Sequence, residues 1–282
     1  MAATVDGSTA TVIQVGMLLQ EAVSQAEVFD MIYEDAVLAS SFWVNVALAG
    51  LSILLFVYMG RDVEDPRAQL IFVATIVVPV VSLSSYLGLA SGLTVSVVEM
   101  PGGALAGEEV LSMWGRYLTW TLSTPMILLA LGLLAGSNST KIFTAIVFDV
   151  AMCVTGLAAA LTTSSYALRW GWYGVSCTFF AVVLYVLLVE WPKDAAETGT
   201  AEIFSTLKLL TVILWFGYPV FWALGAEGIG VLGVAVTSWA YSALDVGAKY
   251  VFAYLLLSYV ADEPASVTGL TGLSGGATAV DD

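Results

Sequence analysis

Charged residues are scarce in this sequence. Only 11% of the 282 residues are charged, whereas 59% are hydrophobic, and the mean hydropathy is +0.92. An ordinary soluble domain carries about 25% charged residues, so this composition excludes the soluble globular classes. The sequence therefore predicts an integral membrane protein.

Basic residues are scarcer still. The chain has 8 Lys and Arg against 23 Asp and Glu, which gives a net charge of −15. This balance excludes nucleic acid and polybasic lipid contacts. An acidic, lysine-poor surface suits very high salt and favours a halophile over an ordinary organism with an acidic protein. A halophile matters here because its surroundings are rich in halide.

Cysteine is nearly absent too. Cys153 and Cys177 both fall inside apolar stretches, where they are expected to be small apolar side chains and not a disulfide. No basic region precedes a cleavage site at the N-terminus, so no cleaved signal peptide is evident. We expect an extracellular segment over residues 1–35, one seven-helix domain over 36–261 and a flexible cytoplasmic tail over 262–282.

Long apolar runs dominate the rest of the chain. Seven of them can cross a hydrocarbon core of about 30 Å: residues 38–59, 69–90, 114–135, 142–161, 170–190, 207–225 and 234–260. Five basic residues lie in or at the edge of loops on one side: Arg61, Arg67, Lys141, Lys193 and Lys208. Only Arg169 lies on the other side. The sequence thus predicts an all-α, seven-transmembrane helix bundle of the cell membrane, with the N-terminus extracellular and the C-terminus cytoplasmic.

Two shorter features flank the bundle. The run SVVEMPGGALAGEEVLS, residues 96–112, has the turn signals and β-branched residues of a small extracellular hairpin. The segment near residues 12–34 could form a short amphipathic helix over the outer surface. Neither feature indicates a second domain.

Four ionisable residues stand inside the spans: Arg116, Asp149, Asp245 and Lys249. Such groups are costly in a membrane and are usually functional. Asp245 and Lys249 are four residues apart, on one face of the last span. They could form an internal ion pair that is buried but has no function. Burial also disfavours the ammonium form of lysine, which leaves the amine available to form a Schiff base with a carbonyl compound.

Two other spans carry aromatic residues that could face this lysine. Trp215, Tyr218 and Trp222 share one face of the sixth span, and Trp120 lies in the third. Aromatic stripes are more often packing surfaces than cofactor pockets. Together with the buried lysine and with Pro219, this one favours a pocket for a large conjugated ligand.

Three motifs identify a family. RYLTWTLSTP (116–125), WFGYPVFW (215–222) and LDVGAK (244–249) resemble the microbial rhodopsins, and the resemblance covers all seven spans. It implies that Lys249 carries all-trans retinal as a protonated Schiff base beside Asp245. It also implies retinal contacts for Trp120, Trp215, Tyr218 and Trp222 and, from FDVAMCVTG (148–156), for Met152, Thr155 and Gly156.

The kind of rhodopsin depends on charge. Proton pumps of this family carry two carboxylates on the third span, where this chain has Thr119 and Ala130. Arg116 and the protonated Schiff base give +2, Asp245 gives −1, and Asp149 without a basic partner is taken as protonated, so the site keeps +1.

A bound anion would balance that charge. Arg116, Thr119 and Ser123 lie on one helical face and offer a guanidinium and two hydroxyl donors. On spacing alone, each hydroxyl would more often bond the carbonyl one turn back. The missing countercharge favours the anion.

Finer details resemble the halorhodopsin branch of the family, which comprises light-driven inward chloride pumps. They are the hydroxyl spacing of the third span, EMP at 99–101 and AMCVTGLAAALTTSS at 151–165. The resemblance implies a chloride or other halide as cargo, Lys208 and Thr211 along the cytoplasmic exit, and a homotrimer among membrane lipids, with a carotenoid as a candidate partner. Glu227 is expected to be a surface or loop acid. No metal site is predicted. The alternative is a phototaxis receptor that signals through a membrane transducer.

Overall fold

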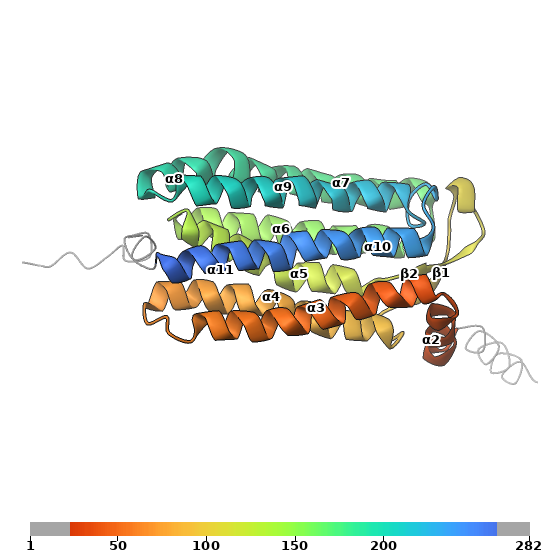
Figure 1. Ribbon diagram of the computed structural model, residues 1–282. Helices are drawn as coiled ribbons and strands as arrows, with labels where there is room; N and C mark the ends of the chain where they lie inside the picture. The colour runs from red at the N-terminus through yellow and green to blue at the C-terminus, as the bar shows by residue number, and fades with distance from the viewer. Residues whose placement is uncertain (1–22, 264–282) are drawn as a thin grey trace, which may run out of the picture.

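The computed structural model describes residues 23–263 of the chain. Within them, long antiparallel helices form an elongated bundle, with a hairpin and a short helix at one end (Figure 1). Seven helical units in this part of the chain are long and apolar enough to cross a membrane, which confirms the predicted fold class. They are α3 (Ala36–Gly60), α4 (Pro66–Ala90), α5 (Gly115–Leu134), α6 (Ser139–Leu161), α7 with η2 and α8 (Tyr166–Thr198), α9 (Ala201–Leu224), and α10 with η3 and α11 (Val234–Asp262).

Polar caps determine where several of these helices begin. The side chains of Asp35, Asp65, Asn138 and Ser165 accept hydrogen bonds from backbone N–H groups in the first turns of α3, α4, α6 and α7. Such caps satisfy donors that have no partner inside the helix. These four helices therefore start a few residues before the apolar runs that predicted them.

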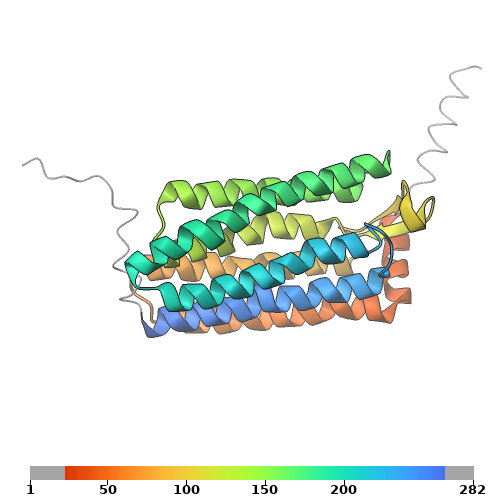
Figure 2. The same ribbon diagram turned by 90° about the horizontal axis from the view of Figure 1, so that it is seen from above.

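The predicted extracellular hairpin is present. Strand β1 (Ser96–Glu99) pairs antiparallel with β2 (Glu109–Ser112), and the 3-10 turn η1 (Gly103–Leu105) lies between them. Helix α2 (Gln25–Glu34) crosses the same end of the bundle, roughly perpendicular to the long helices (Figures 1 and 2). It confirms the predicted surface helix over those residues, whereas positions 12–22 of that prediction lie outside the described residues.

Helix α5 occupies the middle of the bundle. In an apolar 18-residue stretch of α5, 67% of the residues are buried, whereas 22–50% are buried in the corresponding stretches of the other six spans. A helix surrounded by protein can carry polar groups that lipid would not tolerate. Because α5 carries the RYLTWTLSTP motif, its arginine and hydroxyls are placed inside the protein.

The last spanning unit contains a widened turn. Helix α10 (Val234–Asp245) passes into the π-helical turn η3 (Val246–Val251) and then into α11 (Phe252–Asp262). A second π-helical turn, η2 (Val186–Glu190), joins α7 (Tyr166–Tyr185) to α8 (Trp191–Thr198). Single π turns are frequently found at functional sites, and η3 carries Lys249.

Candidate functional site

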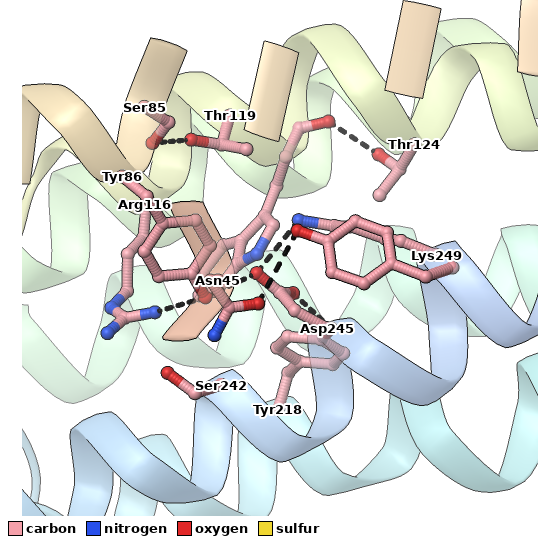
Figure 3. A network of polar contacts seen from close by, with 12 residues as sticks. Asn45, Ser85, Tyr86, Arg116, Thr119, Thr124, Tyr218, Ser242, Asp245 and Lys249 are labelled. Carbon is pink, nitrogen blue, oxygen red and sulfur yellow. Dashed lines mark hydrogen bonds and ion pairs between the residues drawn. The ribbon is translucent and has the colours of Figure 1, made fainter. Parts of the chain in front are cut away.

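Lys249 and Asp245 meet in the bundle interior, as their spacing predicted. Both are fully buried, and Nζ of Lys249 lies 3.0 Å from Oδ2 of Asp245 (Figure 3). The carboxylate also accepts hydrogen bonds from the hydroxyl of Tyr86 on α4, at 2.7 Å, and from that of Tyr218 on α9, at 2.6 Å. The other polar partners of the pair are therefore on the carboxylate, and two other spans, α4 and α9, help to fix the position of Asp245.

Arg116, in the first turn of α5, is buried among neutral groups. Nη1 donates to the hydroxyl of Tyr86 at 3.2 Å, and Nη2 donates to Oγ of Ser238 at 2.7 Å (Figure 3 shows the first contact). The guanidinium carbon lies 5.3–5.8 Å from the ring centroids of Phe42, Tyr86 and Tyr241. Nε has no hydrogen-bond partner, and no described carboxylate lies within ion-pair distance. The protein interior thus holds a full positive charge without a protein anion against it.

The two hydroxyls that follow Arg116 on its face behave differently. The hydroxyl of Thr119 lies 3.0 Å from the carbonyl oxygen of Gly115, one turn back, and also contacts Oγ of Ser85. Ser123 is fully buried, yet its Oγ has no hydrogen-bond partner among the described residues. The carbonyl-bonding alternative is thus observed for Thr119, whereas Ser123 keeps a free donor.

An apolar cavity opens beside Lys249. Its walls come from α5, α6, α7, α9 and α10, and η3 contributes the lysine and Ala248. The lining residues are Tyr117, Trp120, Thr124, Ile127, Met152, Cys153, Gly156, Tyr173, Ser176, Cys177, Phe180, Trp215, Tyr218, Pro219, Trp222, Tyr241, Ala248 and Lys249. Aromatic walls around a primary amine suit a flat, conjugated, apolar ligand with a carbonyl end.

Comparison with known proteins identifies the family. Residues 36–263 match the sequence model of the family described as "Bacteriorhodopsin-like protein". The chain belongs to this family.

Several halorhodopsins are similar to this chain over most of its length. The halorhodopsin of Halorubrum sodomense is 71% identical over 248 residues, or 88% of each chain. That of Natronomonas pharaonis is 64% identical over 262 residues, or 89% of this chain and 90% of the relative. A solved structure described as "Halorhodopsin, a light-driven chloride pump" superposes with a TM-score of 0.82 at 60% identity, covering 83% of this chain and 99% of that one. The chain is therefore a bacteriorhodopsin-like protein of the halorhodopsin branch.

The cavity brings most of the predicted retinal contacts of this rhodopsin together. Trp120, Met152, Gly156, Trp215, Tyr218 and Trp222 all line it with Lys249. Thr155 does not, and its hydroxyl lies within hydrogen-bond distance of the carbonyls of Ala151 and Met152 in its own helix. Cys153 and Cys177 are free thiols, as predicted, and both line the cavity.

Several lining residues had no signal in the sequence. Tyr173, Ser176 and Cys177 belong to α7, which contributed no motif. The ring of Tyr173 stacks on that of Trp222 at 4.7 Å between centroids, and its hydroxyl donates to the carbonyl of Pro219. The packing of α7 against α6, together with the contacts of Tyr173 to α9, brings these residues to the cavity.

Two charged residues at the hairpin end of the bundle have partners that the sequence did not predict. Arg169, counted as a loop residue, lies in the first turn of α7 and is fully buried, where it donates to the carbonyls of Ala160, Thr162 and Glu227. Glu227 was expected to be a surface or loop acid. It lies in the loop after α9, but it is half-buried and accepts hydrogen bonds from Ser112 and Tyr117, both at 2.8 Å. It therefore joins the hairpin and α5 to that loop.

Asp149 on α6 is buried, and none of the described basic residues forms an ion pair with it. Its Oδ2 accepts a hydrogen bond from Thr124 at 2.6 Å, and Oδ1 has no partner within the described chain. A buried carboxylate in such surroundings is far more stable when neutral. This environment agrees with treating Asp149 as protonated.

The predicted cytoplasmic residues lie on α9, one turn apart. Thr211 is buried, and its hydroxyl has no partner among the described residues. Lys208 is half-buried. Neither residue lines the cavity around Lys249, so any role in an exit path requires a passage from that cavity along α9.

Proposed function

We infer that this protein is a light-driven inward chloride pump of the cell membrane. It is 71% and 64% identical to two halorhodopsins. A similar solved structure is described as a light-driven chloride pump, and another, with a TM-score of 0.82 at 60% identity, as a bromide-bound form. The single observation in this chain that carries the proposal is a buried site with more positive than negative charge.

The charge count includes Arg169 and Glu227, which the sequence analysis had treated as loop residues. Arg116, Arg169 and Lys249 are buried cations, and we count as negative the carboxyl groups of Asp245, which faces Lys249, and of half-buried Glu227. With Asp149 neutral, three positive charges against two negative ones leave +1. Desolvating an unbalanced charge is costly, so an anion at this site stabilises the folded protein and is held by it.

The residues around the cavity fit retinal. Among the described residues, Lys249 is the one lysine in its wall, and aromatic rings form much of the remaining surface together with small and aliphatic side chains. When bound to Lys249 as a Schiff base, retinal supplies light absorption and a light-driven change of shape. The chain supplies the surroundings: Asp245 faces the Lys249 nitrogen at 3.0 Å, and Tyr86 and Tyr218 hold that carboxylate in place.

The anion is proposed to bind between Arg116, Ser123 and the Lys249 N–H group. Arg116 offers its charge, and neither its Nε–H nor the hydroxyl of Ser123 has a hydrogen-bond partner in the described part of the chain. Thr119 contributes less, because its hydroxyl is already close to a carbonyl acceptor of its own helix. A halide accepts hydrogen bonds from all sides, so donors from two helices can share it.

Transport requires the Lys249 N–H group to change the side to which it points. In the resting state this donor acts with Arg116 on the extracellular side. Once it points the other way, the anion follows it past Lys249, and Thr211 with Lys208 offers the next donors toward the cytoplasm. Moving one charge against the membrane potential costs about 2.3 kcal/mol per 100 mV, far less than the energy of a visible photon.

The function is tested by light-induced pH change in vesicles that hold the protein in one orientation. Chloride import makes the interior negative, so protons follow passively and a protonophore enhances their uptake. A proton pump would instead lose its signal when the protonophore is added. No light-driven signal in either condition would favour the phototaxis receptor. The predicted homotrimer and carotenoid partner stay predictions, which chromatographic mass and the visible spectrum of the purified protein would test.

A further inference from the structure

Helix α2 is held rigidly across the extracellular end of the bundle. Val28 and Ile32 are buried against the ends of α3 and α4, in a cluster that includes Phe42 and Tyr86. The turn after α4 fits the helix closely, since Gly92, at φ +72°, lies so near that a Cβ atom there would stand 3.2 Å from the backbone of α2. The orientation of α2 is therefore a property of the fold.

Each side of α2 has a different chemistry. Successive residues turn by roughly 100° around a helix, so Phe29 and Tyr33 form a stripe about a quarter turn from the buried Val28 and Ile32. Phe29 and Tyr33 are 41% and 38% exposed, and their rings lie 4.4 Å apart. The acidic residues Glu27, Asp30 and Glu34 lie on the side opposite the buried pair, and all are exposed.

The aromatic stripe continues onto the outer surface of α3. The indole N–H of Trp43 donates to the hydroxyl of Tyr33 at 3.0 Å, and Trp43 and Val37 are themselves 48% and 56% exposed. Farther along α3, Leu51 and Leu54 are 63% and 70% exposed on a helix that spans the membrane. The apolar side chains of α2 thus extend the surface that faces lipid.

We propose that α2 is an interfacial helix whose Phe29–Tyr33 stripe, with Trp43, binds the headgroup and acyl boundary of the outer lipid leaflet. Its axis is perpendicular to the spanning helices and so lies in the plane of the membrane (Figures 1 and 2). Tyrosine and tryptophan favour this depth because they are apolar with one polar tip. The acidic side faces water, where hydrogen bonds from the backbone N–H and hydroxyl of Ser24 hold the pKa of Glu27 below its ordinary value.

Spin labels in the full-length protein test the proposal. Phe29→Cys and the neighbouring Asp30→Cys are labelled with a nitroxide and reconstituted in phospholipid vesicles, and the parent with Cys153 and Cys177 gives the background. Oxygen concentrates in lipid, whereas a nickel chelate stays in water. We expect the ratio of oxygen to nickel collisions to be several-fold higher at position 29 than at position 30, at a depth of about 5–10 Å.

Two results would overturn the proposal. Equal access of the nickel chelate to both labels would place the aromatic stripe in water. Protection of position 29 from both reagents would show that a second protein chain covers it. If Phe29→Cys fails to fold, as judged by a lost visible band, Ala26→Cys probes the same stripe from an exposed, small position.

Discussion

Arg116 and Asp245 are held apart by one hydroxyl group, that of Tyr86. This hydroxyl accepts a hydrogen bond from Nη1 of Arg116 and donates one of 2.7 Å to Oδ2 of Asp245. A direct ion pair would neutralise both side chains. Because the hydroxyl intervenes, Asp245 remains the partner of Lys249, and the charge of Arg116 remains available to an anion from outside.

The first prediction concerns Lys249. Lys249→Ala and Lys249→Arg should both give a colourless protein without photocurrent, since neither side chain forms a Schiff base. Lys208→Ala should keep the visible band, because Lys208 lies outside the cavity. Absorption spectra of the three purified variants provide the measurement. A coloured Lys249→Ala protein would contradict the retinal site.

The second prediction concerns colour and halide. An anion beside the Lys249 nitrogen holds positive charge near that atom in the ground state, so its removal should narrow the excitation gap. Dialysis into a salt of a large anion should move the absorption band to longer wavelength, and added chloride should reverse the shift along a single-site curve. A spectrum that is indifferent to halide at constant ionic strength would exclude an anion at this position.

The third prediction separates the two hydroxyls on α5. Ser123→Ala removes a buried donor that has no partner among residues 23–263, so the chloride affinity should fall by about 1.5–3 kcal/mol, or roughly tenfold to a hundredfold. Thr119→Val should cost less, because the hydroxyl of Thr119 already lies 3.0 Å from a backbone carbonyl. The chloride titration of the absorption band measures both. The reverse ranking would move the anion toward Thr119.

The fourth prediction concerns Asp149. If this carboxyl group is neutral, Asp149→Asn exchanges one uncharged side chain for another and should leave the chloride affinity essentially unchanged. The infrared spectrum of the parent should show a protonated carboxyl stretch that the variant lacks. A many-fold tighter chloride affinity in Asp149→Asn would instead show that Asp149 is charged in the parent. The parent site would then have no surplus positive charge.

The fifth prediction concerns two glycines with the same backbone conformation. Gly92 and Gly107 have φ of +72° and +78°, which non-glycine residues adopt at a cost of about 1 kcal/mol. A Cβ atom at Gly92 would also press on the backbone of α2, whereas one at Gly107 would meet nothing within 4 Å. Gly92→Ala should therefore speed hydrogen exchange over residues 25–34, and Gly107→Ala should not. Equal exchange in both variants would show that α2 is not seated on this turn.

Features that depend on residues close together in the chain were predictable from the sequence. The seven spans followed from apolar length, the hairpin from turn residues, and the contact of Lys249 with Asp245 from a spacing of four on one helix. Each of these depends on neighbours in the chain. The predicted retinal contacts on α5, α6 and α9 came from motifs, and all except Thr155 line the cavity.

Contacts between distant segments were not predictable. Tyr86 and Ser238 reach Arg116 from α4 and α10, 30 and 122 residues away in sequence. The difference between Thr119 and Ser123 depends on Ser85 and on local backbone geometry, which a one-letter pattern does not contain. Arg169 resembled a loop cation because its helix begins at a capping serine, Ser165, several residues before the apolar run.

The π-helical turn that carries Lys249 divides the last spanning unit into two rotational registers. A π turn holds one more residue than an α turn, so α11 is rotated relative to where an unbroken α10 would have placed it. The extracellular half, with Ser238 and Asp245, and the cytoplasmic half, with Leu256 and Val260 in the core, each keep their own buried face. Folding the same residues as one regular α-helix would turn α11 by about 100° and could align only one of those faces with the bundle. The widened turn thus absorbs one residue, and Lys249 lies where the two registers meet.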